Sequence, residues 1–222
     1  MSPLDNPVYS SLKAAHAAFA READGLLRYA SDVAPFLAIP EAGPVSAAAL
    51  DALVDDRAYM IGPRPIVPAG WLVEDLGRIH QMVCAEPLPV PPGPPSDVLG
   101  EADRPVVLAL AALVYPHYFR PRTMELGRYL GVRGEAGLDA MIGERMAAPG
   151  FREISAVCTH PTWVGRGLAR RLLAIASNEI FARGETPFLH VSPNNQRAVR
   201  LYEQNGYRHR IDVPFWSVQR RP

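Results

Sequence analysis

Lysine is nearly absent from this sequence of 222 residues, in which Lys13 is the only example. A phosphate loop of the kind that binds ATP requires a lysine directly after Gly-x-x-x-x-Gly, so this class of nucleotide site is excluded. Cysteine is almost as rare: Cys84 and Cys158 lie far apart, and neither has a companion Cys or His at metal-ligand spacing. This scarcity argues against a disulfide framework and a structural zinc site. We therefore expect two reduced thiols and no bound metal.

Long apolar runs and an excess of one charge are also missing. The longest apolar stretch, residues 106–115, is far too short to span a bilayer, and the first residues lack the basic flank and apolar run of a signal peptide. The formal net charge is 0 at pH 7, which argues against a surface built to bind nucleic acid. With 48% hydrophobic residues, the chain can bury a core. These features predict a cytoplasmic, globular protein with no membrane or nucleic-acid partner.

Proline is concentrated in residues 87–95, where its fixed φ angles and missing amide donors exclude a helix interior or a central strand. This segment is predicted to be a stiff linker that ends a first region, residues 1–95, and precedes a domain at residues 96–222. The first region holds 6 basic and 11 acidic side chains, and the second holds 17 and 12. The basic second half favours an anionic ligand, although ordinary scatter between two halves would give a similar split.

The first region is predicted to be a smaller α/β unit without a catalytic constellation. Apolar residues recur at helical spacing over residues 8–30, and residues 47–54 predict a second helix. Residues 57–61 and 78–84 are candidate strands. Whether this region is a degenerate copy of the second half that completes an acceptor cleft is left open.

Strand and helix signals alternate from Asp97 onward, which predicts a mixed α/β fold. Strands are expected at residues 98–99, 129–132, 138–146, 151–159, 187–191, 207–213 and 215–219. Helices are expected at residues 106–113, within 121–126, from 168 to the glycine at 184, and at 195–204.

The most informative segment joins the strand at 151–159 to the helix that follows Gly165-Arg166-Gly167. Glycines stand where a Ser, Thr or Asp would normally accept from the first helical amides, so several N–H groups are expected to remain free at the positive end of the helix dipole. Such an end can hold phosphate. A dinucleotide fingerprint is excluded, because Arg170 occupies its third glycine position.

Two motifs occur in order in the second half. The first is Val164-Gly165-Arg166-Gly167-Leu168-Ala169, and the second consists of Asn195, Ala198, Leu201, Tyr202, Gly206 and Tyr207. Together they resemble the GNAT superfamily of acyl-CoA-dependent N-acyltransferases, which has Gln/Arg-x-x-Gly-x-Gly/Ala after its fourth strand and Asn-x-x-Ala-x-x-Leu-Tyr before a Gly and an aromatic. Either motif alone is a weak signal. The resemblance covers residues 96–222 and implies a central mixed, mostly antiparallel sheet with flanking helices.

The resemblance also implies acetyl-CoA as cosubstrate. Family members hold its pyrophosphate on the backbone of the first motif and pair the fourth strand with pantetheine. Carried over to this chain, the candidate cofactor-binding residues are Val157, Cys158, Thr159, Val164, Gly165, Arg166, Gly167, Leu168, Ala169, Arg170, Asn195 and Tyr202. Val164 departs from the family's Gln or Arg, which removes a side-chain contact but leaves its N–H. Arg166, Arg170 and Arg171 are either replacements for that contact or solvated helix positions.

Acyl transfer to an amine requires that the ammonium lose a proton and that the leaving thiolate gain one. Glu153, on the fourth strand of the resemblance, is the candidate base. The alternatives are that it forms an ion pair with Arg152 or Arg145, and that a chain of waters removes the proton. Tyr202 is the candidate general acid, because the family places a tyrosine hydroxyl near the thioester sulfur.

Three further side chains flank the expected cleft. Cys158 is expected to be a buried thiol and not a nucleophile. His160 and His190 either bind the acceptor, relay a proton or have structural roles. The sequence therefore predicts an N-acetyltransferase that transfers acetyl from acetyl-CoA to a primary amine, on a small molecule or a peptide, by direct attack on the thioester. The alternative is a CoA-binding regulatory or scaffold protein without turnover. The acceptor and the oligomeric state do not follow from the sequence.

Overall fold

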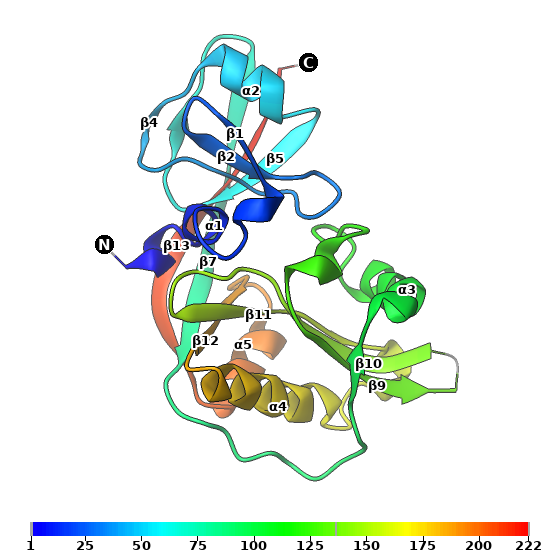
Figure 1. Ribbon diagram of the computed structural model, residues 1–222. Helices are drawn as coiled ribbons and strands as arrows, with labels where there is room; N and C mark the ends of the chain where they lie inside the picture. The colour runs from blue at the N-terminus through cyan, green and yellow to red at the C-terminus, as the bar shows by residue number, and fades with distance from the viewer. Residues whose placement is uncertain (1, 136, 222) are drawn as a thin grey trace.

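The computed structural model describes residues 2–135 and 137–221 and is organised around one eight-stranded sheet (Figure 1). The strand order is β5-β13-β7-β12-β11-β10-β9-β8. The bounds are β5 Arg57–Ile61, β7 Trp71–Cys84, β8 Asp97–Leu99, β9 Tyr129–Gly134, β10 Gly137–Glu144, β11 Phe151–Thr159, β12 Thr186–Val191 and β13 Tyr207–Arg220. Every neighbouring pair is antiparallel except β11 and β12, which run parallel. The expected mixed, mostly antiparallel sheet is therefore confirmed.

Smaller elements surround this sheet. A three-stranded sheet contains β1 Ala20–Ala23, β2 Leu26–Tyr29 and β3 Leu37–Ala38, and a two-stranded one contains β4 Gly43–Pro44 and β6 Pro65–Ile66. The α-helices are α1 Pro7–Leu12, α2 Ala47–Leu53, α3 Arg104–Val114, α4 Leu168–Ala182 and α5 Gln196–Gln204. Short 3-10 turns lie at Pro3–Asp5, Ala17–Phe19, Glu101–Asp103, Thr123–Leu126 and Pro161–Trp163. No helix in the described ranges is long and apolar enough to cross a membrane.

Helices α3 and α4 cover opposite faces of the sheet. Successive side chains of a strand point to opposite faces, and β10 follows this rule. Ala140 and Ile142 share a buried cluster with the apolar stripe of α4, whereas Met141 packs with α3. The α4 residues in the first cluster are Leu168, Leu172, Leu173, Ala176 and Ile180. Leu168, Leu172, Ala176 and Ile180 recur every four residues, which is the pattern that predicted this helix.

Strands β7 and β13 connect the two halves of the chain. Both are long, and Figure 1 shows them running between the part with α1 and α2 and the part with α4 and α5. Strand β13 pairs with β5 and β7 from the first 95 residues, and β7 also pairs with β12. The sheet therefore crosses the boundary expected at residue 95. The division of the chain into a region at 1–95 and a domain at 96–222 stays a prediction.

The proline-rich segment, residues 87–95, lies against α4. The side-chain amide of Asn178 accepts from the backbone N–H of Leu88 at 2.7 Å and donates to its carbonyl at 2.8 Å. Arg171 donates through Nε to the carbonyl of Pro94 at 2.9 Å and through Nη1 to that of Pro91. These contacts attach the segment to the helix at two places.

Several expected elements differ from the structure. The helix expected over residues 8–30 is wrong beyond Leu12, because Asp24 and Gly25 form the turn of a β1-β2 hairpin with φ of 45° and 78°. A turn of two such residues with positive φ selects a hairpin and overrides helical spacing. The strands expected at 207–213 and 215–219 form one strand, β13, in which Pro214 lies beside a shift in register. Within residues 121–126, a short 3-10 turn forms instead of an α-helix.

Candidate active site

Strands β11 and β12 run side by side at their first residues and then separate. Their parallel pairing ends with Ile154 opposite Leu189, while β11 continues to Thr159. Ala156 lies in this stretch with φ of 49°, a left-handed conformation that costs a non-glycine residue about 1 kcal/mol. The pairing of β11 with β10 is irregular at the same place. A bulge therefore bends β11 and leaves its edge open on the β12 side.

The first turn of α4 presents backbone amides that the protein does not use. Gly165 and Gly167 have φ of 86° and 79°, in the left-handed region that suits glycine. Among the residues that the structure describes, the N–H groups from Val164 to Arg170 have no hydrogen-bond acceptor, and the first helical bond runs from Arg171 to the carbonyl of Gly167. Free amides at the positive end of a helix dipole suit a phosphate.

The three arginines considered as phosphate contacts have different surroundings. Arg166 stacks on Trp163 with its guanidinium carbon 4.3 Å from the ring centre. Arg170 donates through Nε to the side-chain oxygen of Asn205 at 3.1 Å. Arg171 donates to carbonyls of the proline-rich segment. Arg171 therefore anchors that segment, and Arg166 keeps its N–H groups without a protein acceptor in the described chain.

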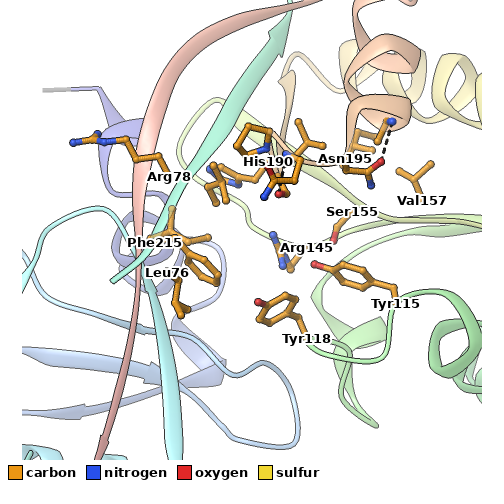
Figure 2. Close-up of a pocket in the computed structure, with 18 of the residues that line it drawn as sticks. Leu76, Arg78, Tyr115, Tyr118, Arg145, Ser155, Val157, His190, Asn195 and Phe215 are labelled. Carbon is orange, nitrogen blue, oxygen red and sulfur yellow. Dashed lines mark hydrogen bonds between the residues drawn. The ribbon is translucent and has the colours of Figure 1, made fainter. Parts of the chain in front are cut away.

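A pocket of about 540 Å³ opens where β11 and β12 separate (Figure 2). One end is lined by β11 and α5, through Ser155, Ala156, Val157, Asn195, Ala198 and Tyr202. The other end is apolar and is lined by Phe36, Ile61, Leu76, Ile79 and Phe215. Tyr115, Tyr118, Arg145 and His190 also line the pocket. Both halves of the chain therefore build it.

Tyr202 lies on α5 at the β11 end of the pocket. Its side chain is buried, and its hydroxyl has no hydrogen-bond partner among the described residues. Burial raises the pKa of this phenol above its usual value, so it stays protonated at neutral pH, as a general acid must. The same helix begins at Asn195, whose side-chain oxygen accepts from the N–H of Ala198 at 3.1 Å (Figure 2). Asn195 thus fixes the first turn of the helix that carries Tyr202.

Glu153 is completely buried and is not part of the pocket lining. Its carboxylate accepts from Nε and Nη2 of Arg145 at 2.8 and 2.7 Å and from Nδ1 of His190 at 2.7 Å. Burial opposes ionisation, but the charge of Arg145 and these hydrogen bonds lower the pKa of Glu153 to about 2. Such a carboxylate has little tendency to take a proton from an ammonium group. Its expected role as the base stays a prediction.

His190 is held by a partner at each ring nitrogen. Nε2 lies 3.1 Å from the side-chain nitrogen of Gln81, which also donates to the carbonyl of Leu4 at 2.8 Å. Arg210 donates to the oxygen of the same amide at 2.8 Å, which fixes the orientation of Gln81. An amide nitrogen only donates, so Nε2 accepts and Nδ1 carries the proton toward Glu153. Neither ring nitrogen is left to take a proton from the pocket.

The remaining predicted residues lie at the edges of the site. Val157 lines the pocket, whereas Cys158 is buried beside α3. Burial raises the pKa of the Cys158 thiol to about 12, which keeps it protonated. Thr159 ends β11, and His160 lies on an exposed turn where Nδ1 is 2.8 Å from the hydroxyl of Thr162.

Sequence reasoning missed several pocket residues. Tyr115 and Tyr118 belong to an aromatic segment directly after α3, and their cluster around Pro116 was the available signal. The sequence suggested Arg145 only as an alternative ion-pair partner of Glu153. Phe36 and Phe215 come from distant parts of the chain, and no local pattern marks them as site residues.

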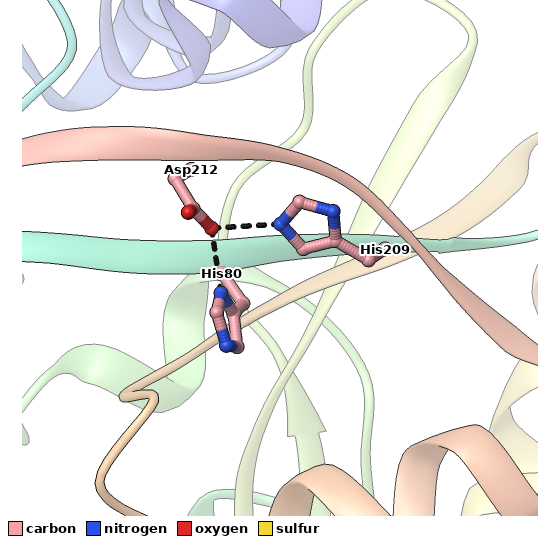
Figure 3. Close-up of side chains that lie close together, drawn as sticks. All are labelled: His80, His209 and Asp212. Carbon is pink, nitrogen blue, oxygen red and sulfur yellow. Dashed lines mark hydrogen bonds and ion pairs between the residues drawn. The ribbon is translucent and has the colours of Figure 1, made fainter.

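A second polar cluster lies on β7 and β13 (Figure 3). Nδ1 of His80 and Nε2 of His209 lie 2.6 and 2.7 Å from the same oxygen of Asp212, and these hydrogen bonds lower the pKa of Asp212. Side chains alternate between the faces of a strand, so His209 and Asp212, three positions apart, would normally point to opposite sides. The shift in register after His209 brings both to one side of β13. The residue at the shift is Arg210, which contacts Gln81. The irregularity in β13 thereby supports the wall of the pocket.

Comparisons with known proteins identify the family. A family model described as FR47-like protein matches residues 129–217. A solved structure from Novosphingobium aromaticivorans, whose description places it in the GNAT family of acetyltransferases, is 33% identical, and the match covers 100% of both chains with a TM-score of 0.87. The chain belongs to the GNAT family. The resemblance seen in the two sequence motifs is therefore confirmed.

More distant GNAT structures share the fold. A GCN5-related N-acetyltransferase from Kribbella flavida is 20% identical, over 95% of this chain and 93% of that chain, with a TM-score of 0.61. A GNAT acetyltransferase from Colwellia psychrerythraea is 14% identical, over 80% of this chain and 64% of that chain, with a TM-score of 0.53. No curated protein sequence matches the chain. The fold is thus that of the GNAT N-acyltransferases.

GNAT proteins use an acyl-CoA, and two features of this chain fit that molecule. The unused amides from Val164 to Arg170 suit its pyrophosphate, and the open edge of β11 beyond Ile154 suits the amide groups of pantetheine. When bound, an acyl-CoA supplies an activated thioester. The departure at Val164 leaves its amide available, as expected from the sequence.

Proposed function

We propose that this GNAT protein is an N-acetyltransferase that transfers the acetyl group of acetyl-CoA to a primary amine. The pocket carries the proposal, because it joins the open edge of β11 and the hydroxyl of Tyr202 to an acceptor end built by both halves of the chain. A site that only held CoA would not need this acceptor end.

The proposed reaction is a direct attack. The amine nitrogen adds to the thioester carbonyl, the C–N bond forms, the C–S bond breaks, and the thiolate takes the proton of the Tyr202 hydroxyl. A backbone N–H near Val157 stabilises the oxyanion. The acceptor ammonium loses one proton to water before the attack, and its nitrogen loses a second proton after the C–N bond forms. The second proton returns through water to the Tyr202 phenolate, since Glu153 and both nitrogens of His190 are engaged within the protein.

In this scheme Glu153 is a positioning residue. It accepts from Arg145 and His190, both of which line the pocket, and so fixes two side chains that face the acceptor. Direct proton transfer to Glu153 is the competing role, and the pH dependence of a Glu153→Gln variant separates the two.

The alternative of a CoA-binding protein without turnover has no observation of its own among the described residues. An assay separates it from the enzyme: acetyl-CoA is incubated with a panel of primary amines, and release of free thiol is followed. We expect turnover with at least one amine. Binding of CoA without turnover on any amine would favour the regulatory alternative, and absence of CoA binding would refute both.

The Tyr202→Phe variant tests the general acid. Loss of the hydroxyl should lower kcat by about 100-fold and leave the affinity for CoA in calorimetry nearly unchanged. Tyr207→Phe is the matched control, because the Tyr207 hydroxyl is bonded to Ser177 at 2.8 Å in the core and lies outside the pocket. Equal effects of the two substitutions on kcat would contradict the role of Tyr202.

A further inference from the structure

Arg145 has a hydrogen-bonding edge that the protein leaves unused. Its side chain is 9% exposed, and Nε and Nη2 both donate to Glu153. The ring of Phe36 covers one face of the guanidinium, with the central carbon 4.8 Å from the ring centre. Nη1 makes no well-aligned hydrogen bond to a described residue, although Arg145 lines the pocket. A guanidinium in so restricted a space favours an acceptor from a ligand.

The charges around the pocket favour an anion. Its lining contains Arg145 and no Asp or Glu among the described residues. Arg78 also lines the pocket, but its guanidinium points away from it (Figure 2) and donates to the carbonyl of Asp212 at 3.1 Å. Glu153 lies behind Arg145 and is fully buried, so it offers no contact to a cation in the pocket. A second ammonium group on the acceptor would therefore meet a guanidinium and no carboxylate. The charges of the pocket are therefore not complementary to those of a polyamine.

The position of Arg145 suggests where the anion lies on the acceptor. Figure 2 shows Arg145 between the β11 and α5 end, marked by Val157 and Asn195, and the apolar end, marked by Leu76 and Phe215. An acceptor whose amine lies at the first end would thus place its own anionic group beside Arg145 and its apolar group at the apolar end. The smallest acceptor that carries an amine, an anion and an apolar group together is an apolar α-amino acid.

We propose that the acceptor is an amine with a carboxylate on the adjacent carbon and an apolar side chain, and that Arg145 binds the carboxylate through Nη1. The inference rests on the proposed N-acetyltransferase activity and names its substrate class. The Tyr115 hydroxyl lies close to Arg145, and the charge and hydrogen-bonding contact of that guanidinium oppose the rise that burial causes in the pKa of Tyr115. A phenol and a guanidinium together supply two donors to one carboxylate.

A phosphate is a poorer fit than a carboxylate. The charge of Arg145 is already shared with Glu153, so a dianion bound at Nη1 would also be repelled by that carboxylate. A carboxylate carries one charge and matches the planar edge of the guanidinium. The aromatic side chains of Phe36, Tyr118 and Phe215 suit an aromatic or aliphatic group on the acceptor.

Matched acceptors test this inference on the unmodified protein. L-Phenylalanine, L-phenylalaninamide and phenethylamine share the amine and the ring, and only the first has the carboxylate. We expect kcat/KM for phenylalanine to exceed both others by about 10- to 100-fold. The amide has the less basic amine and thus more of the reactive free form, so this bias works against the expected result. Equal or greater kcat/KM for the neutral acceptors would overturn the inference and leave the proposed function intact.

Two Arg145 variants assign the preference to this residue. Arg145→Lys keeps a cation beside Glu153, and Arg145→Gln removes it. In both variants, kcat/KM for phenylalanine should come to within about 3-fold of kcat/KM for phenethylamine. The change should come mainly from a higher KM for phenylalanine, because its carboxylate loses the ionic hydrogen bond to the guanidinium. A general loss of fold would lower both acceptors equally. An unchanged ratio in a folded Arg145→Lys variant would contradict the assignment.

Binding without turnover separates this inference from the proposed function. Calorimetry in the presence of CoA should show tighter binding of N-acetyl-L-phenylalanine than of N-acetylphenethylamine, by about 10-fold or more. Equal affinities would overturn the inference. Acetyl-CoA binding with this preference but no acetyl transfer would refute the proposed enzyme and retain the carboxylate site.

Discussion

The side-chain amide of Gln81 on β7 donates to the ring of His190 on β12 at 3.1 Å, so the first and second halves of the chain meet in the wall of the pocket. Strand β7 also lies between β12 and β13 in the sheet. Without β7, β13 loses its connection to the remaining strands of the second half.

Residues 96–222 expressed alone are therefore expected not to fold. The fragment lacks β5 and β7, which are the two sheet partners of β13 among the described residues. Thermal unfolding followed by circular dichroism should show no cooperative transition, with the full chain as control. A cooperative transition together with CoA binding by the fragment would instead support an independent domain beginning at residue 96.

Glu153→Gln distinguishes positioning from proton transfer. Glutamine has nearly the same shape but cannot pair as an anion with Arg145, so the KM for a carboxylate-bearing acceptor should rise about 10-fold or more. The pH dependence of kcat should keep its form. Were Glu153 the base, kcat would fall by about 100- to 10,000-fold and its acidic limb would disappear. A stability measurement on the same variant identifies any part of the change that comes from unfolding.

Gly167→Ala tests the start of α4. At φ of 79°, an alanine costs about 1 kcal/mol, and the shift that relieves it would move the free amides. We expect CoA affinity to fall about 10-fold, because a displaced amide no longer donates to pyrophosphate. Gly184→Ala is the matched control, since Gly184 has φ of 75° at the far end of the same helix and equally open space around its Cα. Equal losses of CoA affinity would point to a general effect on the helix.

His16 gives the fold a pH dependence of known sign. Nε2 donates to the carbonyl of Leu126 at 3.0 Å, so Nδ1 accepts from the Tyr29 hydroxyl at 2.8 Å. Burial lowers the pKa of His16 from 6.5 to about 4. The unfolded chain therefore takes up this proton more readily, and stability is full above pH 6.5 and decreases as the pH falls toward 4.

The size of this effect is about 3 kcal/mol for the full shift. Chemical denaturation between pH 7 and pH 4 should show it, and His16→Gln should remove this part of the slope. Protonation of Glu153 also decreases stability, but at lower pH, between its unfolded pKa near 4.5 and its folded pKa of about 2. The contributions of His16 and Glu153 can therefore be separated. An unchanged slope between pH 6.5 and 4.5 in His16→Gln would contradict the assignment.

The second half of the fold follows closely from local patterns. The four-residue spacing of Leu168, Leu172, Ala176 and Ile180 predicts α4, and the structure confirms it. The positive φ of Gly167 fits the expectation that this helix begins without a side-chain cap. These elements are set by residues near one another in sequence, which is why sequence reasoning reaches them.

The pocket depends on contacts that local patterns do not encode. Phe36 and Phe215 line it together although almost the whole chain separates them. The pairing of Glu153 with Arg145 and His190 depends on how β11, β12 and the chain after β10 come together. A carboxylate near a motif is visible in the sequence, but its burial and its low pKa depend on neighbours that only the folded chain brings.

The long sequence separation between β13 and its partners β5 and β7 affects how the sheet folds. Strand β5 and one edge of β7 wait for residues 207–220 before they find their partner. During synthesis these edges stay unpaired until residues 207–220 have been added, so this part of the sheet forms late. Deletion of β13 would leave β5 and one edge of β7 without their strand partner, and such exposed β-edges promote aggregation.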